Sequence, residues 1–197
     1  SIQHAHGLAA AAAGAREHYG YSPIPDGVDQ AEAYVRTALD EQKRGESIPY
    51  AIVDLRRDRI AGSTRYLDLD YWSGPPWITE PVAAAMALGA TPTVAEIGHT
   101  WLAASAQRTG INVEMKLLML GQAFDDWECL RISLKTDALN QRSRTAITAL
   151  GATFEGVRRA HMPAADGGIR DSAYYSILAT EWPSVRDHLL ARLDRYR

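Results

Sequence analysis

Hydrophobic and polar residues alternate along this chain with two different periods, which predicts both helices and strands. An alanine-rich segment over residues 4–19 and a segment that begins near Asp26 are both expected to be helices. In the second segment the apolar residues recur every three or four positions, as in a helix with one buried face. They are Val28, Ala31, Val35, Ala38 and Leu39.

Two strands and a long connection are expected next. Residues 48–55 are apolar on both faces, which predicts a strand inside a sheet, and residues 59–69 are expected to return as its hairpin partner. Prolines and glycines then interrupt the pattern over residues 73–93, within which a short helix is expected at residues 82–88. So long a connection is typical of a functional loop, a surface insertion or a dimer contact.

The second half of the chain alternates strands and helices. The predicted strands cover residues 93–102, 130–136, 153–162 and 169–178, and the predicted helices cover residues 112–127, 140–150 and 181–196. This order predicts a single mixed α/β domain over residues 1–197, with an earlier strand expected before Ser1.

The composition is that of an ordinary globular protein and excludes several classes. Hydrophobic residues make up 46% of the 197 residues and charged residues 23%. The net charge of −3 lacks the basic excess that a general nucleic-acid binder needs. The longest run of small apolar residues, 8–13, is too short to span a bilayer, and Cys129 is the single cysteine. We therefore expect a cytoplasmic protein that binds neither nucleic acid nor a membrane.

A strand, a basic turn and a helix start follow one another over residues 96–112. In the turn, Arg108 supplies a cation, and Gly110 can approach a ligand closely or adopt a positive φ. The free amides at the start of the helix would point toward a bound anion. The turn has neither the Gly-Lys-Ser/Thr sequence of a Walker loop nor the three spaced glycines of a dinucleotide site. The pattern predicts an anion site and excludes these two nucleotide motifs.

A second segment makes this pattern more specific. Asn140 and Ser143 open a predicted helix, which ends in Leu-Gly-Ala at residues 150–152 and is followed by Glu-Gly at residues 155–156. Together with the turn at residues 107–112, these motifs resemble the GNAT superfamily of acetyl-CoA-dependent N-acetyltransferases. Within it, they are most similar to the ribosomal-protein-alanine N-acetyltransferase branch.

The resemblance covers roughly residues 48–182 and implies both a fold and a co-substrate. The fold would be a mixed, mostly antiparallel sheet flanked by helices, with a splayed central pair of strands at the acetyl-CoA site. Asn112 stands where the family usually has Gly or Ala, and it can tolerate a left-handed backbone or cap the helix. The residues assigned to acetyl-CoA are Trp101, Leu102, Gln107, Arg108, Thr109, Gly110, Ile111, Asn112, Val113 and Asn140.

Acetyl transfer needs a neutral amine, a stabilised oxyanion and a proton for the leaving thiolate. Glu96 is the first candidate for the base because it is the carboxylate on the strand that leads into the turn; a solvated charge or an ion-pair partner is the alternative. His99 is the second candidate, expected on the face of Trp101 and opposite Glu96, unless it is a packed histidine. The resemblance assigns the acid role to Ser143, with Tyr175 as its rival.

The acceptor site is expected where the strand at residues 59–69 ends. Asp68 and Asp70 fall on one face of a regular strand and could attract a cationic amine, or they could be exposed strand-end charges. The other residues expected at the acceptor site are Tyr71, Trp72 and His99, with the loop at residues 73–93. The histidines lack the spacing of a metal site, so no metal is expected. Tryptophans within residues 72–77 could form a homodimer patch.

The leading hypothesis is direct acetyl transfer from acetyl-CoA to a primary amine. Because Cys129 has no histidine near it in the sequence, a covalent route through this thiol is not expected. The acceptor is either a protein N-terminus or a small amine such as an aminoglycoside or a polyamine, and a closed acidic pocket would favour the small cation. The alternative is a catalytically inactive acyl-CoA-binding module that acts as a sensor or assembly partner.

Overall fold

The computed structural model describes residues 1–14, 16–72 and 89–196. The strands are β1 (Ser47–Asp54), β2 (Arg59–Asp70), β3 (Val94–Leu102), β4 (Arg131–Asp137), β5 (Thr153–Pro163) and β6 (Ile169–Leu178). The α-helices are α1 (Ala5–Ala12), α2 (Gly27–Lys43), α4 (Ile111–Gly121), α5 (Gln141–Thr148) and α6 (Trp182–Leu193). Short 3-10 turns are η1 (Ile2–His4), η2 (Arg16–Tyr19), η3 (Ala104–Ala106) and η5 (Asp194–Tyr196), and α4 continues as a π-helical turn, η4 (Gln122–Asp126).

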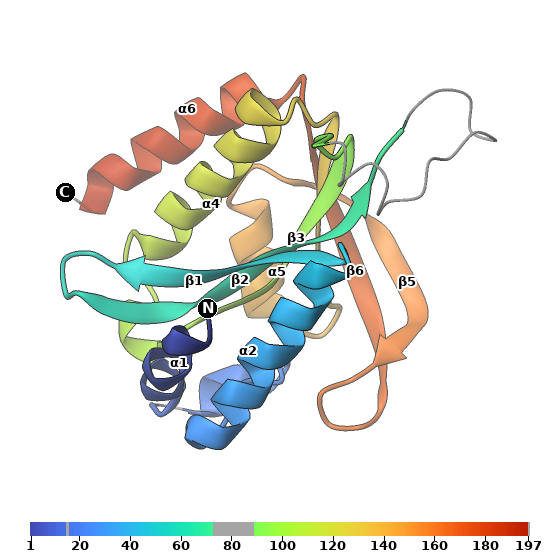
Figure 1. Cartoon of the computed structure of the whole chain (residues 1–197). Coiled ribbons are helices and arrows are strands. Elements are labelled where there is room, and N and C mark those ends of the chain that lie inside the picture. The colour runs from blue at the N-terminus through green and yellow to red at the C-terminus, as the bar shows by residue number, and fades with distance from the viewer. Residues whose placement is uncertain (15, 73–88, 197) are drawn as a thin grey trace.

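The strands form one sheet in the order β1-β2-β3-β4-β6-β5. Neighbouring strands are antiparallel except for β3 and β4, which are parallel. Figure 1 shows α1 and α2 on one face of the sheet and α4, α5 and α6 on the other. The predicted fold class and the predicted order of elements are confirmed. The short helix predicted at residues 82–88 lies outside the described residues.

Two predicted elements differ from the structure. The first helix ends at Ala12, where the Arg16 guanidinium donates to the Ala12 carbonyl at 3.4 Å and also to the carbonyl of Pro25 at 3.2 Å. Strand β1 lies at the edge of the sheet and not inside it. Its two apolar faces are explained by helices on both sides, since β1 contacts α2 and the Tyr50 hydroxyl donates to Gln122 after α4 at 3.2 Å.

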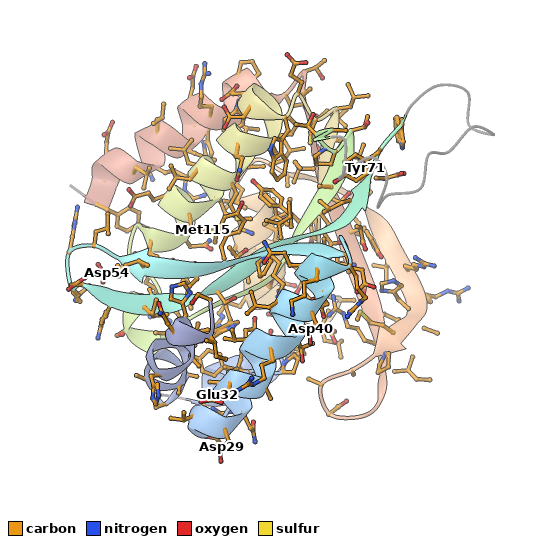
Figure 2. The ribbon with its side chains drawn as sticks, viewed as in Figure 1. Asp29, Glu32, Asp40, Asp54, Tyr71 and Met115 are labelled. Atoms are coloured by element: carbon orange, nitrogen blue, oxygen red, sulfur yellow. The ribbon has the colours of Figure 1, made fainter. Side chains whose placement is uncertain are left out.

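The core lies between the sheet and the two helical layers. In α2, Ala31, Val35 and Ala38 are buried, while Figure 2 shows Asp29, Glu32 and Asp40 along the opposite, outer side of the helix. On the other face, Met115 lies between α4 and the sheet (Figure 2). Each large apolar side chain buried in this way stabilises the fold by about 1.5–3 kcal/mol. Within the described residues, no helix is both long and apolar enough to cross a membrane.

Candidate active site

Strands β3 and β4 are neighbours over a short stretch and then separate. The paired residues are Val94 with Arg131, Ala95 with Ile132 and Glu96 with Ser133. Beyond Glu96, residues 97–102 of β3 pair with β2 alone within the described part of the chain. The predicted splayed pair is therefore present, and one edge of β3 is unpaired. We call the space between residues 97–102 of β3 and the part of β4 beyond Ser133 the gap. A ligand with amide groups can add to such an edge as another strand would.

The turn after β3 is fastened by side-chain hydrogen bonds. Thr109 Oγ1 donates to the Ala106 carbonyl at 2.6 Å and accepts from the Ile111 amide at 3.4 Å. Gln107 Nε2 donates to the Leu102 carbonyl at 3.1 Å. The turn therefore links the end of β3 to α4. Thr109 occupies the Ile111 amide, and the amides that follow in the first turn have no partners within the helix and can face an anion.

The backbone of this turn differs from its prediction at two residues. Gly110 precedes α4 with a φ of −64°, so of the two possibilities given for this glycine the positive φ is not adopted; Arg108 has a left-handed backbone, with a φ of 59°. Asn112, which could have capped the helix or taken a left-handed backbone, does neither, because α4 begins at Ile111 and Asn112 lies within its first turn. A Cβ on Gly110 would lie 3.3 Å from Cβ and Cγ of Tyr196, so the close approach at this glycine is made by the C-terminal segment.

The start of α5 lies where the motif predicts it. Asn140 Oδ1 accepts a hydrogen bond from the Ser143 amide at 3.0 Å and caps the helix. Tyr175 is 2% exposed, and its hydroxyl accepts a hydrogen bond from Arg144 Nε at 3.1 Å. The Asn140 oxygen and the Tyr175 hydroxyl, both predicted site atoms, thus have partners within the protein.

A β-bulge in β3 changes which side chains share a face. His99 and Thr100 both stand opposite Thr64 of β2, and His99 has a φ of 48°. The extra residue reverses the alternation of faces beyond it. Glu96 and Trp101 therefore lie on the same face, toward α2, and the prediction that they face opposite sides is wrong because it assumed a regular strand.

A second bulge, in β2, affects the predicted acceptor residues. Asp68 has a φ of 47°, and the register with β3 shifts beside it, so the regular strand that would place Asp68 and Asp70 on one face is absent. Asp68 Oδ2 lies 3.3 Å from Lys135 Nζ. Asp70 accepts hydrogen bonds from Trp72 Nε1 at 2.8 Å and from the Tyr71 amide at 2.9 Å. The two carboxylates therefore have different partners.

Glu96 lies at the centre of a charged cluster where the gap begins. It is 2% exposed, and its Oε2 is 2.9 Å from Lys135 Nζ. Burial raises the pKa of Glu96 above its ordinary value, although the Lys135 charge opposes this shift. Its Oε1 lies 2.7 Å from the place that a Cβ on Gly98 would take, so a glycine at this position leaves room for the carboxylate. Glu96 is therefore not a solvated charge: it forms an ion pair with Lys135, and its role as a base stays a prediction.

His99 and Arg65 lie on the same face of the sheet. The His99 side chain is exposed, yet partial desolvation and then the charge of Arg65 lower its pKa, which favours the neutral imidazole. Arg65 is buried, forms an ion pair with Glu41 of α2 and lies 4.8 Å from the ring centroid of Tyr34. This face therefore combines a buried carboxylate, an exposed neutral histidine and two ion pairs.

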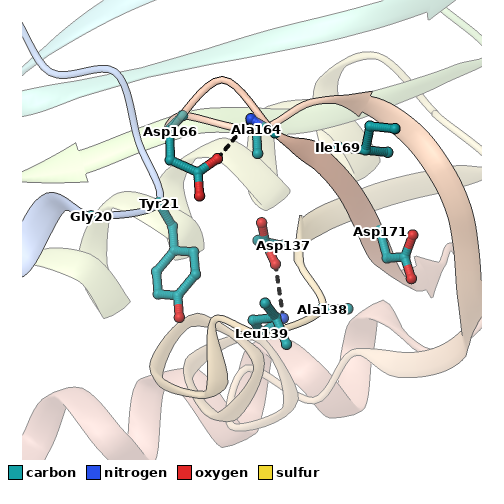
Figure 3. A pocket seen from close by; sticks show the side chains of 11 residues that line it. Gly20, Tyr21, Asp137, Ala138, Leu139, Ala164, Asp166, Ile169 and Asp171 are labelled. Atoms are coloured by element: carbon teal, nitrogen blue, oxygen red, sulfur yellow. Dashed lines mark hydrogen bonds between the residues drawn. The ribbon is translucent and has the colours of Figure 1, made fainter.

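A cavity of about 390 Å³ opens beside the carboxyl end of β4. Figure 3 shows Tyr21, from the α1–α2 connection, facing Asp137 at the end of β4 and Asp166 in the β5–β6 loop. Asp171 is a third carboxylate in the lining. One oxygen of each carboxylate accepts a hydrogen bond from a backbone amide; for example, the Leu139 amide donates to Asp137 Oδ1 at 2.8 Å. No lysine, arginine or histidine is among the residues that line the cavity.

Thiol and metal chemistry receive no support from the described residues. Cys129 is buried, and its Sγ donates to the Pro92 carbonyl at 3.0 Å. Burial raises the pKa of this thiol to about 11, which keeps it protonated near neutrality. Across residues 1–14, 16–72 and 89–196, no group of three or more His, Cys, Asp or Glu side chains is arranged to hold a metal ion.

Comparison with known families identifies the fold around this gap. A family model described as an acetyltransferase (GNAT) domain matches residues 1–153. The chain belongs to the GNAT acetyltransferase family. This family uses acetyl-CoA as its acetyl donor, and the prediction made from the sequence assigns the donor site to residues on β3 and in the turn that follows it.

Solved GNAT structures share the fold of this chain. A GCN5-related N-acetyltransferase from Brucella melitensis is 23% identical, over 97% of this chain and 78% of that chain, with a TM-score of 0.80. Mycobacterium smegmatis RimJ in complex with CoA-disulfide is 19% identical, over 98% and 86%, with a TM-score of 0.75. The ribosomal-protein-S5-alanine acetyltransferase from Vibrio fischeri is 16% identical, over 92% and 91%, with a TM-score of 0.66. None of the curated proteins compared with the chain matches it.

Several polar side chains around the gap of this GNAT domain were not predicted. Lys116 had a signal in the sequence, because it stands in the apolar stripe of α4 between Val113 and Leu120. The pair of Arg65 and Glu41 had none, since nothing in the local sequence reveals a contact between residues on a strand and a distant helix.

Proposed function

We propose that this GNAT domain transfers the acetyl group of acetyl-CoA directly to a small cationic primary amine. The observation that carries the donor half is the separation of β3 from β4 after Glu96, which leaves residues 97–102 of β3 with an open edge. The pantetheine arm would add to this edge, and its pyrophosphate would lie at the turn and the first amides of α4. The RimJ structure, which is similar in fold, holds a CoA-disulfide.

The acceptor half rests on the cavity at the end of β4. Its three carboxylates are Asp137, Asp166 and Asp171. The charge of Arg170, which is not a lining residue, acts on Asp137, but the net charge of the three carboxylates and this cation stays negative and favours a positively charged ligand. The volume of about 390 Å³ suits a small molecule better than a length of extended peptide. These features favour a polyamine or an aminoglycoside over a protein N-terminus.

The residues at the gap supply the proton transfers of this reaction. Glu96, with its raised pKa, would take the proton of the attacking ammonium through water. The neutral amine then attacks the thioester carbonyl, the new C–N bond forms and the C–S bond breaks. As the amide forms, its nitrogen loses a second proton to water; Ser143, in the first turn of α5, would give its hydroxyl proton to the CoA thiolate and recover one from that water. We prefer Ser143 to Tyr175, whose buried hydroxyl already accepts from Arg144.

Release of free CoA, measured with a thiol reagent, tests the proposal. Wild-type protein with acetyl-CoA is mixed with spermidine, with an aminoglycoside or with a peptide that starts with alanine, and acetyl-CoA binding is followed by calorimetry. We expect CoA release with a small amine. Asp137→Asn should raise the KM for that amine several-fold, which corresponds to a loss of about 1 kcal/mol of binding free energy, because one attractive charge is lost. Asp29→Asn, on the outer side of α2, is the matched control.

The other outcomes separate the alternatives. If CoA is released with the peptide but with neither small amine, the acceptor is a protein N-terminus. Binding of acetyl-CoA without release to any amine would favour an inactive acyl-CoA-binding module. If folded wild-type protein does not bind acetyl-CoA, the donor half of the proposal is wrong.

A further inference from the structure

Lys116 is a buried cation on the face of the sheet that is opposite Glu96. It lies on α4, is 5% exposed, and donates from Nζ to Thr100 Oγ1 at 3.1 Å. The chain has two other lysines, Lys43 and Lys135, and both form ion pairs with carboxylates, whereas the partner of Lys116 is a hydroxyl. A buried cation without a carboxylate beside it is unfavourable, so its retention in the core calls for a role.

Lys116 begins a chain of hydrogen bonds that joins α4 to two strands. Thr100 Oγ1 on β3 is 2.8 Å from Thr64 Oγ1 on β2, and Thr64 Oγ1 lies 3.6 Å from Met119 Sδ on α4. Both threonine hydroxyls are 3.5 Å from the Gly98 carbonyl oxygen. These contacts hold the Thr100 side chain toward α4.

Thr100 is one of the two residues of the bulge at the gap. The other, His99, has a left-handed φ of 48°, which is unfavourable for a residue with a side chain and must be held by its surroundings. The bulge lies on the stretch of β3 whose other edge is unpaired. Whatever holds Thr100 toward α4 therefore also sets the backbone at residues 98–101 and the direction of His99.

We propose that Lys116 is a positioning residue for acetyl transfer. It holds Thr100, and through Thr100 it fixes the bulged backbone that borders the gap, so that the thioester and the amine meet in the reactive orientation. This role rests on the proposed function, because the group that it positions is the thioester of acetyl-CoA. Small displacements of a reactive orientation lower a rate strongly without a matching loss of binding.

The protonation of Lys116 gives the role a pH dependence. A charged amine donates a stronger hydrogen bond than a neutral one. Burial lowers the pKa of Lys116 to about 7, and Glu96 on β3 is the charged group that opposes this shift. From the elements packed against it, Lys116 otherwise contacts the neutral hydroxyl of Thr100, which is itself hydrogen-bonded to the hydroxyl of Thr64. We therefore expect kcat to decline as the pH rises above this pKa.

The test compares Lys116→Met, Thr100→Val and the double variant with Lys43→Met, a matched control at an exposed lysine. CoA release is measured with saturating acetyl-CoA and spermidine from pH 6 to pH 9, and acetyl-CoA binding is measured separately. We expect Lys116→Met to lower kcat about tenfold or more, with the Kd for acetyl-CoA within about twofold of wild type. The kcat of the double variant should be no lower than that of the poorer single variant. The decline of kcat above pH 7 should be absent in Lys116→Met.

The proposal is overturned if folded Lys116→Met keeps the wild-type kcat, if its decline with pH persists, or if the losses of the two single variants multiply. If Lys116→Met does not fold, Thr100→Val carries the kcat test. Amide exchange at residues 98–101 needs no substrate and remains informative even if the wild-type protein transfers nothing. Faster exchange there in Lys116→Met or Thr100→Val supports the positioning role, and unchanged exchange contradicts it.

Discussion

The two faces of β3 carry charge in different ways where this strand leaves β4. On the face toward α2, Glu96 pairs with Lys135, and Arg65 of the neighbouring strand pairs with Glu41. On the face toward α4, the buried Lys116 donates to a threonine hydroxyl. The charges named on the first face are therefore balanced in ion pairs, whereas on the second face Lys116 has a hydroxyl as its partner.

This difference shows how one strand can carry a reactive carboxylate on one face and be held in position by contacts on its other face. A buried ion pair tolerates burial because each charge compensates the other, and when Glu96 takes a proton, Lys135 keeps its contact with Asp68. A lone buried cation has its pKa lowered and depends on hydroxyl partners, which makes it sensitive to pH. We interpret the α2 face as the side where the acceptor reacts and the α4 face as the side that shapes the strand.

The largest effect is expected from Glu96→Gln, which removes the candidate base from the α2 face. Acetyl transfer should fall by about 100-fold to 1,000-fold, since general bases contribute rates of this order. The fold should persist, because Lys135 keeps its contact with Asp68. Glu32→Gln, at an exposed pair on α2, is the control, and CoA release is the measurement. Wild-type rates in folded Glu96→Gln would remove Glu96 from the mechanism.

The stability of the α2 face should depend on the pairing of Arg65. Glu41→Gln leaves this buried guanidinium without its carboxylate, so the free energy of unfolding should fall by about 3 kcal/mol. Asp40→Asn, which breaks the exposed pair with Lys43, should change it by less than about 1 kcal/mol. Urea denaturation of both variants gives the two free energies of unfolding. Equal losses would mean that the buried pair stabilises the fold no more than the exposed pair does.

A smaller, pH-dependent effect is expected on the α4 face. An unfolded lysine stays protonated up to about pH 10, whereas burial lowers the pKa of Lys116 to about 7 in the folded protein. Between these values the unfolded chain binds more protons, so the stability of the wild type should rise with pH relative to Lys116→Met, by on the order of 1 kcal/mol per pH unit. The difference between wild type and Lys43→Met should not change with pH. If the difference in free energy of unfolding between wild type and Lys116→Met does not change with pH, the pKa of Lys116 is not lowered by folding.

The order of elements could be predicted from the sequence because hydrophobic periodicity reports which faces are buried. Asn140 could also be identified as a helix cap, since capping depends on residues that are close in the chain. The bulges at Asp68 and His99 could not, because they arise from the register between strands, and each one reverses the faces that a regular strand would give. The partners of Glu96 and Arg65 depend on this register in the same way.

Hydrogen exchange along the unpaired edge of β3 is the most direct test of acetyl-CoA binding at the gap. The amides of residues 97–102 and of the turn at residues 107–113 would be compared without ligand and with saturating acetyl-CoA. If the pantetheine arm adds to β3 and the pyrophosphate lies at the start of α4, exchange should slow in these two segments and remain unchanged at the β1–β2 turn. Binding of acetyl-CoA that leaves both segments unprotected would contradict the assignment of this gap as the donor site.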